Sequence, residues 1–187
     1  MKTKHFFIAI VALLLSSISM QAQSSSATKK ILVVYFSHSG NTREVANQIK
    51  DLTGGDIFEI LPVKAYPNDY QACVDQAKKE INAKYKPALK TKVKNISSYD
   101  IIFVGSPCWW STMAPPVATF LSSYNLAGKT IIPFMTHEGS EMGRTVSDIK
   151  KLCPKSTVTE GLAIRGSHVK ESKGNVMKWL REKKIVK

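Results

Sequence analysis

The chain has 187 residues, enough for one domain with a buried core and too few to indicate two. Its 43% hydrophobic and 22% charged residues exclude a disordered, collagen-like or disulfide-scaffold protein. The formal net charge is +13, from 27 basic and 14 acidic residues. Such a charge favours encounters with anionic membranes, acidic proteins or nucleic acid, although lysines on solvated helix faces are the simpler explanation.

The N-terminus has the order of a secretory signal peptide. Lys2 and Lys4 precede an apolar run over 6–15, and small polar residues then lead to a cleavage position after Ala22. The run is shorter than the roughly 20 residues that cross a bilayer, and no cysteine follows that could accept a lipid. We therefore expect an exported, periplasmic or secreted protein that is not transmembrane after cleavage. Its three parts are a signal peptide over 1–22, a linker over 23–29 and a folded domain over 30–187.

Apolar runs rich in β-branched residues recur along the domain, as expected of parallel strands that are covered on both faces. The five predicted strands are 31–36, 56–60, 101–104, 131–134 and 158–164. Segments with a helical spacing of apolar residues lie between and after them. This alternation predicts a doubly wound α/β domain with right-handed crossovers. The predicted helices carry their apolar faces at Val45, Ile49 and Leu52; Tyr70, Val74, Ala77 and Ile81; Val117, Phe120 and Leu121; Val146, Ile149 and Leu152; and Val176, Trp179 and Leu180.

Local signals refine this scheme. Asn41 is predicted to cap the first helix and Gly54 to end it, and Pro115 suits the first turn of the third helix. The stretch 82–98 is rich in lysine, contains Pro87 and lacks a clear period, so it is predicted to be a long surface connection.

Cys73, Cys108 and Cys153 are odd in number and have no CxxC or metal-ligand spacing. We therefore expect neither a disulfide framework nor a metal site, although one pair could still bond.

The loop that leaves the first predicted strand concentrates the chemistry. Ser37-His38-Ser39-Gly40-Asn41-Thr42 leads directly into a helix, whose free N–H groups and partial positive charge suit a phosphate. Gly40 permits close backbone approach, and the hydroxyl groups add neutral donors. The loop lacks both the GxxxxGK[ST] pattern for a triphosphate and the GxGxxG pattern for a pyrophosphate. A monophosphate is the better fit.

This loop resembles the [ST]-x-[ST]-G-x-T phosphate loop of the flavodoxin family, and the resemblance extends from Lys30 to Trp179. Two further loops carry it: Gly105-Ser106-Pro107-Cys108-Trp109-Trp110 and Thr136-His137-Glu138-Gly139-Ser140. The resemblance implies a five-stranded parallel sheet of order 2-1-3-4-5 in a three-layer sandwich, with FMN at the carboxyl ends of the strands. The cofactor-binding residues that it implies are Ser37, His38, Ser39, Gly40, Asn41, Thr42, Pro107, Cys108, Trp109, Trp110, Thr136, His137, Glu138 and Gly139.

Individual roles around the flavin ring stay open. Trp109 or Trp110 would stack on the ring, and the other is expected to plug the core. His137 would contact the flavin rim or a substrate, or only satisfy local polar groups. Glu138 replaces the glycine that resembling proteins often have. Cys108 is expected to fill space, because no base or metal partner is evident.

Three functions follow from this resemblance. The first is FMN-dependent electron transfer without catalytic side chains or a metal, in which the partner is a redox protein or a small quinone-like acceptor. The second is an FMN-dependent NAD(P)H:quinone or flavin oxidoreductase. The third is a flavin-free binding module on the same fold. Binding to nucleic acid is not expected, because the lysines are not interleaved with exposed aromatic residues.

Overall fold

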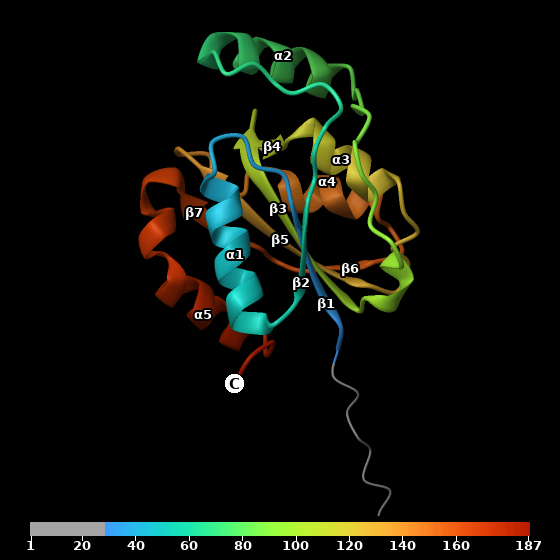
Figure 1. Ribbon diagram of the computed structural model, residues 1–187, viewed down its shortest axis with the longest axis vertical. Coiled ribbons are helices and arrows are strands. Elements are labelled where there is room, and N and C mark those ends of the chain that lie inside the picture. The colour runs from blue at the N-terminus through green and yellow to red at the C-terminus, as the bar shows by residue number, and fades with distance from the viewer. Residues whose placement is uncertain (1–28) are drawn as a thin grey trace, which may run out of the picture.

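A twisted parallel sheet forms the centre of the computed structural model, which describes residues 29–187 (Figure 1). The predicted signal peptide over 1–22, and all of the predicted linker except Lys29, lie outside the described residues. The strands follow the order β2-β1-β3-β5-β6, and β7 also pairs with β5. Their bounds are β1 Ile31–Tyr35, β2 Asp56–Glu59, β3 Ile101–Trp109, β4 Thr112–Met113, β5 Thr130–His137, β6 Thr157–Val158 and β7 Leu162–Arg165. The predicted doubly wound order is confirmed, with β6 and β7 together in the place of the fifth strand.

The fifth predicted strand is interrupted by a bulge. Ile131 lies opposite Val158 and Phe134 lies opposite Leu162, so the outer strand has one more residue than β5 between these pairs. Gly161 lies at the interruption, and a Cβ atom there would be 2.4 Å from the Pro133 carbonyl oxygen. Pro133 also has no N–H to donate to a neighbouring strand. The single run predicted over 158–164 therefore forms two short strands.

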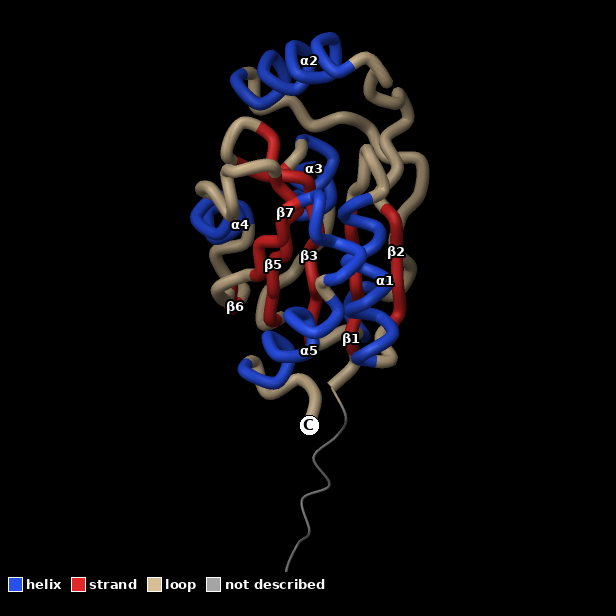
Figure 2. The backbone as a smooth tube through the Cα atoms, turned by 90° about the vertical axis from the view of Figure 1, so that its left-hand side faces the viewer, coloured by secondary structure: helices blue, strands red, loops and turns tan. Residues whose placement is uncertain are grey.

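Helices cover both faces of the sheet and give the predicted three layers (Figure 2). Helices α1 (Asn41–Thr53) and α5 (Lys173–Glu182) pack on one face, around Phe103 and Phe134. Helices α3 (Pro115–Ser122) and α4 (Thr145–Leu152) pack on the other face, around Phe120. Two 3₁₀ turns, η1 (Ile96–Ser98) and η2 (Gly166–Glu171), precede β3 and α5. Within residues 29–187, no helix combines the length and apolar character needed to cross a bilayer.

Helix α2 (Tyr70–Asn82) departs from this arrangement, because it lies across the carboxyl ends of the strands and covers neither face (Figures 1 and 2). The Asp69 side chain caps it by accepting a hydrogen bond from the Ala72 N–H at 2.8 Å. Its buried residues are Cys73 and Ala77, and Tyr70 is 80% exposed. The helix was predicted correctly. Ala77 of its predicted apolar face is buried and Val74 and Ile81 are partly buried, whereas Tyr70 was wrongly placed on that face.

The predicted helix boundaries also need one correction. Gly40, not Asn41, is the N-cap of α1, and its φ of 95° is a left-handed conformation that favours glycine. The prediction for the end of this helix is confirmed, since Gly54 is its left-handed C-cap with φ of 68°. Pro115 lies in the first turn of α3, as predicted.

The lysine-rich connection between α2 and β3 is a surface segment, as predicted. It pairs with residues 61–63 in a short antiparallel ladder, in which the Val63 N–H donates to the Ala88 carbonyl and the Lys90 N–H to the Leu61 carbonyl, both at 2.8 Å. Pro62 lies opposite Leu89 in this ladder and is buried.

Candidate functional site

The three loops predicted to form a site meet at the carboxyl edge of the sheet. They follow β1, β3 and β5, which are neighbours in the sheet. The chain leaves β1 toward β2 on one side and leaves β3 toward β5 on the other, so this edge is a topological switch point. The Thr42 and Thr136 hydroxyl oxygens are 2.8 Å apart, and both residues are buried. This hydrogen bond joins the loop after β1 to the end of β5.

The loop between β1 and α1 presents free backbone donors. The Ser37 hydroxyl accepts from the N–H groups of Gly40 at 3.1 Å and Arg43 at 3.3 Å. Within the described part of the chain, no acceptor contacts the N–H groups of Ser39, Asn41 or Thr42. The space beside the Gly40 Cα is open, with no atom within 4 Å of where a Cβ would lie. The start of α1 therefore offers three amide donors and the helix dipole to an anion.

Trp109 is the packed member of the tryptophan pair. Its ring is half-buried and makes edge contacts with Tyr66 and Phe36, at centroid distances of 4.9 and 5.5 Å. It also contacts His38 of the loop after β1 at 5.9 Å. The His38 Nε2 atom in turn is 2.9 Å from the Pro67 carbonyl oxygen. Trp109 thus joins the core to the proposed phosphate loop.

Trp110 is the exposed member, at 45%. Its indole N–H donates to the Val74 carbonyl of α2 at 3.1 Å, and the Lys78 ammonium lies 4.7 Å from its ring centroid. Of the two tryptophans, Trp109 is the one that packs against the core, with its ring partly buried, and which of them contacts the flavin stays a prediction.

The tight turn between β3 and β4 holds Trp110 in place. Trp110 and Ser111 both have positive φ angles, 50° and 61°, which side chains rarely adopt. Arg144 supports this turn with two hydrogen bonds. Its backbone N–H donates to the Ser111 carbonyl at 2.8 Å, and its guanidinium N–H donates to the Trp110 carbonyl at 3.2 Å. Gly143 lies so close that a Cβ would be 2.3 Å from the Ser111 oxygen. The loop after β5 therefore fixes the loop after β3.

The third loop brings a histidine and a carboxylate to the same edge. His137 is half-buried, and its Nδ1 atom is buried without a hydrogen-bond partner in the described structure. Glu138 is exposed and lies 3.9 Å from Arg165 at the end of β7. A Cβ on Gly166 would be 2.2 Å from a Glu138 carboxylate oxygen and 2.6 Å from the Asn41 amide nitrogen. Gly166 therefore lets side chains of the first and third loops approach each other.

Burial raises the pKa of all three cysteine thiols above the ordinary value. Cys73, Cys108 and Cys153 are all free. Burial raises the pKa of the Cys108 thiol above its ordinary value, although a hydrogen bond from the Ser111 backbone, Arg144 and Ser140 act in the opposite direction. The thiol form dominates at neutral pH, as expected of a space-filling residue.

Sequence reasoning missed several residues around the site. Tyr66 packs against Trp109 and donates a hydrogen bond to Glu80 of α2, so it attaches the helix to the site. Its burial, followed by the contact with Glu80, raises the pKa of its hydroxyl. Arg144 and Gly166 also lie outside the three motifs. No local pattern marks these residues, because each acts through a contact with a distant segment.

Comparison with known families agrees with this architecture. A family model described as Flavodoxin matches residues 30–183. The chain belongs to the flavodoxin family. Among proteins of curated function, none matches it.

Solved structures give the same result. One similar structure is that of a proposed flavoprotein from Bacteroides eggerthii, which is 33% identical in sequence to this chain. The match covers 82% of this chain and 96% of that protein, with a TM-score of 0.73. A Bacteroides uniformis protein of the same proposed class is 30% identical, with coverages of 82% and 98% and a TM-score of 0.74. A Lactobacillus acidophilus flavoprotein, solved in complex with FMN, is 26% identical, with coverages of 76% and 97% and a TM-score of 0.63.

Proposed function

We propose that the protein binds FMN at the carboxyl edge of the sheet and transfers electrons through it. The observation that carries the proposal is the set of three free N–H groups, from Ser39, Asn41 and Thr42, at the start of α1. They match the oxygens of one phosphate group. The Lactobacillus acidophilus flavoprotein supports the choice of cofactor, because its structure contains FMN.

The remaining loops suit the flavin ring. The ring would lie between the loops after β3 and β5, with the exposed indole of Trp110 as an aromatic surface. His137 and Glu138 would line the opposite side. Bound FMN supplies one- and two-electron redox chemistry, and the protein sets its orientation, electrostatic surroundings and access.

The position of α2 favours a carrier over a reductase. This helix lies over the carboxyl ends of the strands and holds Trp110 through the Val74 carbonyl. A reductase needs space for a nicotinamide or quinone against the flavin face, and α2 restricts that space. A carrier needs only an accessible flavin edge.

Two measurements on the purified protein test the proposal. Titration with FMN should quench flavin fluorescence with 1:1 stoichiometry, and anaerobic reduction should then bleach the visible absorption of the complex. Steady-state oxidation of NADH or NADPH with quinones should stay at the rate of free FMN. Rapid turnover with either nucleotide would replace the carrier assignment by the reductase. Protein that ignores added FMN would instead indicate the flavin-free binding module.

A further inference from the structure

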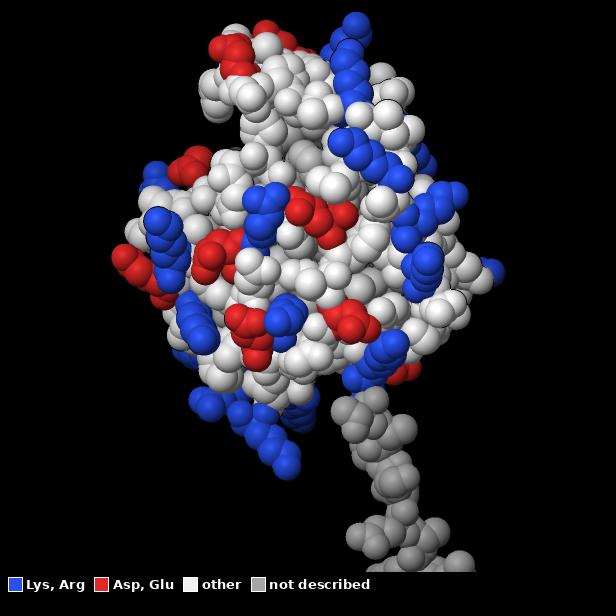
Figure 3. Space-filling view, in the orientation of Figure 1, with Lys and Arg blue, Asp and Glu red and all other residues white. Residues whose placement is uncertain are grey.

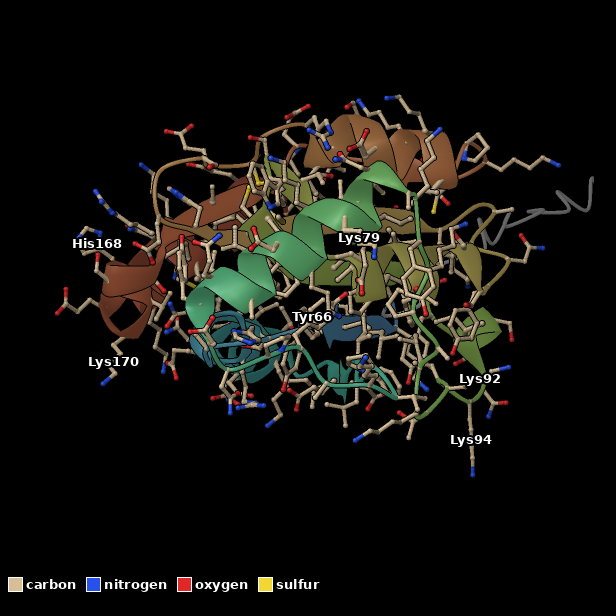
Figure 4. All side chains as sticks on the ribbon, turned by 90° about the horizontal axis from the view of Figure 1, so that it is seen from above. Tyr66, Lys79, Lys92, Lys94, His168 and Lys170 are labelled. Carbon is tan, nitrogen blue, oxygen red and sulfur yellow. The ribbon has the colours of Figure 1, made fainter. Side chains whose placement is uncertain are left out.

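Six exposed lysines lie on the two segments that flank α2 between β2 and β3, and we call them the lysine strip. All six are exposed, and no acidic residue occurs from Ile81 to Tyr99. Figure 3 shows blue side chains down the right-hand edge of the molecule, where Figure 1 places this connection. Figure 4 shows Lys92 and Lys94 at the periphery of the molecule, with Lys94 extended away from it. The strip consists of Lys64, Lys84, Lys86, Lys90, Lys92 and Lys94.

The lysine strip has no compensating carboxylates. Ion pairs occur elsewhere on the described surface, for example between Arg43 and Glu59 at 2.6 Å and between Arg144 and Asp148 at 3.1 Å. Within residues 29–187, none of the six lysines lies within ion-pair distance of an acidic side chain. The like charges therefore remain available, and together they attract an anionic partner.

Exposed apolar side chains lie among these lysines. Leu61, Val63 and Tyr85 are 41, 59 and 54% exposed. Leu61 and Val63 belong to the short ladder that pairs with Ala88 and Lys90. A small apolar centre surrounded by charge is the arrangement of a protein–protein interface.

The lysine strip adjoins the candidate site. It begins at the end of α2, the helix that accepts the Trp110 hydrogen bond. Its other segment leads within two residues from Lys64 to Tyr66, whose ring contacts Trp109. The end of the strip at Lys64, Lys84 and Lys86 therefore lies on the side of the proposed flavin, whereas Lys92 and Lys94 lead toward η1 and the start of β3.

We propose that the lysine strip docks an acidic electron-transfer protein beside the bound cofactor, an inference that rests on the proposed function. The charge selects an anionic partner. Two of the apolar side chains, Leu61 and Val63, lie on a two-stranded ladder, which fits a protein surface better than it fits insertion between lipids. Such a complex is small, short-lived and sensitive to salt, because electrostatic steering accelerates encounter more than it increases affinity.

Stopped-flow oxidation of the reduced holoprotein tests the docking surface. The probe is a ferric cytochrome with an acidic surface, and a basic ferric cytochrome serves for comparison. Each fully reduced flavin releases two electrons and two protons, and two ferric haems accept the electrons. At low ionic strength, the triple variant Lys84→Glu, Lys90→Glu, Lys94→Glu should react with the acidic cytochrome at least about tenfold more slowly than the wild type. The same variant should react with the basic cytochrome faster than the wild type does.

A matched variant separates the strip from overall charge. Lys170→Glu, Lys173→Glu, Lys178→Glu changes the net charge equally, but its lysines lie on η2 and α5, at the opposite face. We expect its rate with the acidic cytochrome to stay within about threefold of the wild type. Equal slowing of both variants, or no slowing of the first, would overturn the proposal. Loss of binding to phosphatidylglycerol vesicles in the first variant, with an unchanged cytochrome rate, would overturn it in favour of a membrane surface.

Failure of FMN binding is distinguishable from failure of docking. The FMN titration tests the cofactor directly. Docking is measured separately with flavin-free protein, by NMR shifts of backbone amides on addition of the acidic cytochrome. Shifts confined to 61–64 and 83–94 support the strip even without flavin, and shifts confined to other segments contradict it.

Discussion

The hydroxyl groups of Thr42 and Thr136 meet at 2.8 Å, across a separation of 94 residues. Thr42 lies in the first turn of α1, and Thr136 lies at the end of β5. Both are buried, so removing one hydroxyl leaves the other without its partner. This contact fixes the proposed phosphate loop relative to the proposed ring-binding loop.

Thr42→Val should therefore weaken FMN binding and lower stability. The substitution keeps the side-chain shape and should cost about 1–2 kcal/mol of unfolding free energy. We expect the FMN Kd to increase by at least about tenfold, measured by fluorescence titration. Thr119→Val is the matched control, because its hydroxyl bonds only to the Pro115 carbonyl of its own helix. If Thr42→Val binds FMN like the wild type, this contact has no role in the site.

The two tryptophans should respond differently to substitution. Trp110 is exposed and Trp109 packs on Tyr66 and Phe36. Trp110→Ala should weaken the binding free energy of FMN by about 1–2 kcal/mol, a Kd roughly 5- to 30-fold higher, with little change in Tm, because it removes an aromatic surface and little core. Trp109→Ala should lower the Tm by several degrees as well. Thermal denaturation and flavin titration of both variants check this. Loss of affinity only in Trp109→Ala would assign the flavin contact to Trp109.

Gly143→Ala should disturb the turn that carries Trp110. Its φ is 48°, and a Cβ would be 2.3 Å from the Ser111 carbonyl oxygen, which is backbone and cannot move aside. We expect about 1–3 kcal/mol lower stability and weaker FMN binding. Gly174→Ala is the control, because no atom apart from its chain neighbours and its own helix's backbone lies within 4 Å of its Cβ position, so this substitution should be neutral or slightly stabilising. Equal stability of the two variants, measured by urea denaturation, would show that the turn tolerates displacement.

The Cys108 thiol should alkylate slowly at neutral pH. Burial raises its pKa, so the reactive thiolate forms only at higher pH than for a free cysteine. The rate with iodoacetamide should still be rising at about pH 9, whereas the same cysteine in the urea-unfolded chain should approach its plateau near that pH. Peptide mass spectrometry separates Cys108 from Cys73 and Cys153. A plateau below about pH 8 for folded Cys108 would show an activated thiolate.

The sequence predicts the central part of this fold well. The runs at 31–36, 101–104 and 131–134 are continuously apolar because helices cover both of their faces, and that requirement is visible in each segment alone. The interruption of the fifth strand is different. It depends on Pro133 and Gly161, which meet only once the strands pair. The sequence of either segment alone does not predict that contact.

The position of α2 shows the same limit. Helical periodicity predicts a helix from Tyr70 to Ile81, but not that the helix crosses the carboxyl edge of the sheet. Its attachment depends on distant contacts, from Tyr66 to Glu80 and from Trp110 to Val74. Which of Trp109 and Trp110 packs inward likewise depends on the positive φ of Trp110. Two identical residues side by side in a sequence give no sign of which one adopts that conformation.

The proposal that the start of α1 binds the FMN phosphate is tested most directly by comparing FMN with riboflavin. The two flavins share the ring, and only FMN carries the phosphate that the Ser39, Asn41 and Thr42 amides would hold. Three hydrogen bonds to a charged group predict that FMN binds at least roughly 100-fold more tightly than riboflavin, in matched titrations at the same salt concentration. Equal affinity for the two flavins would contradict the account.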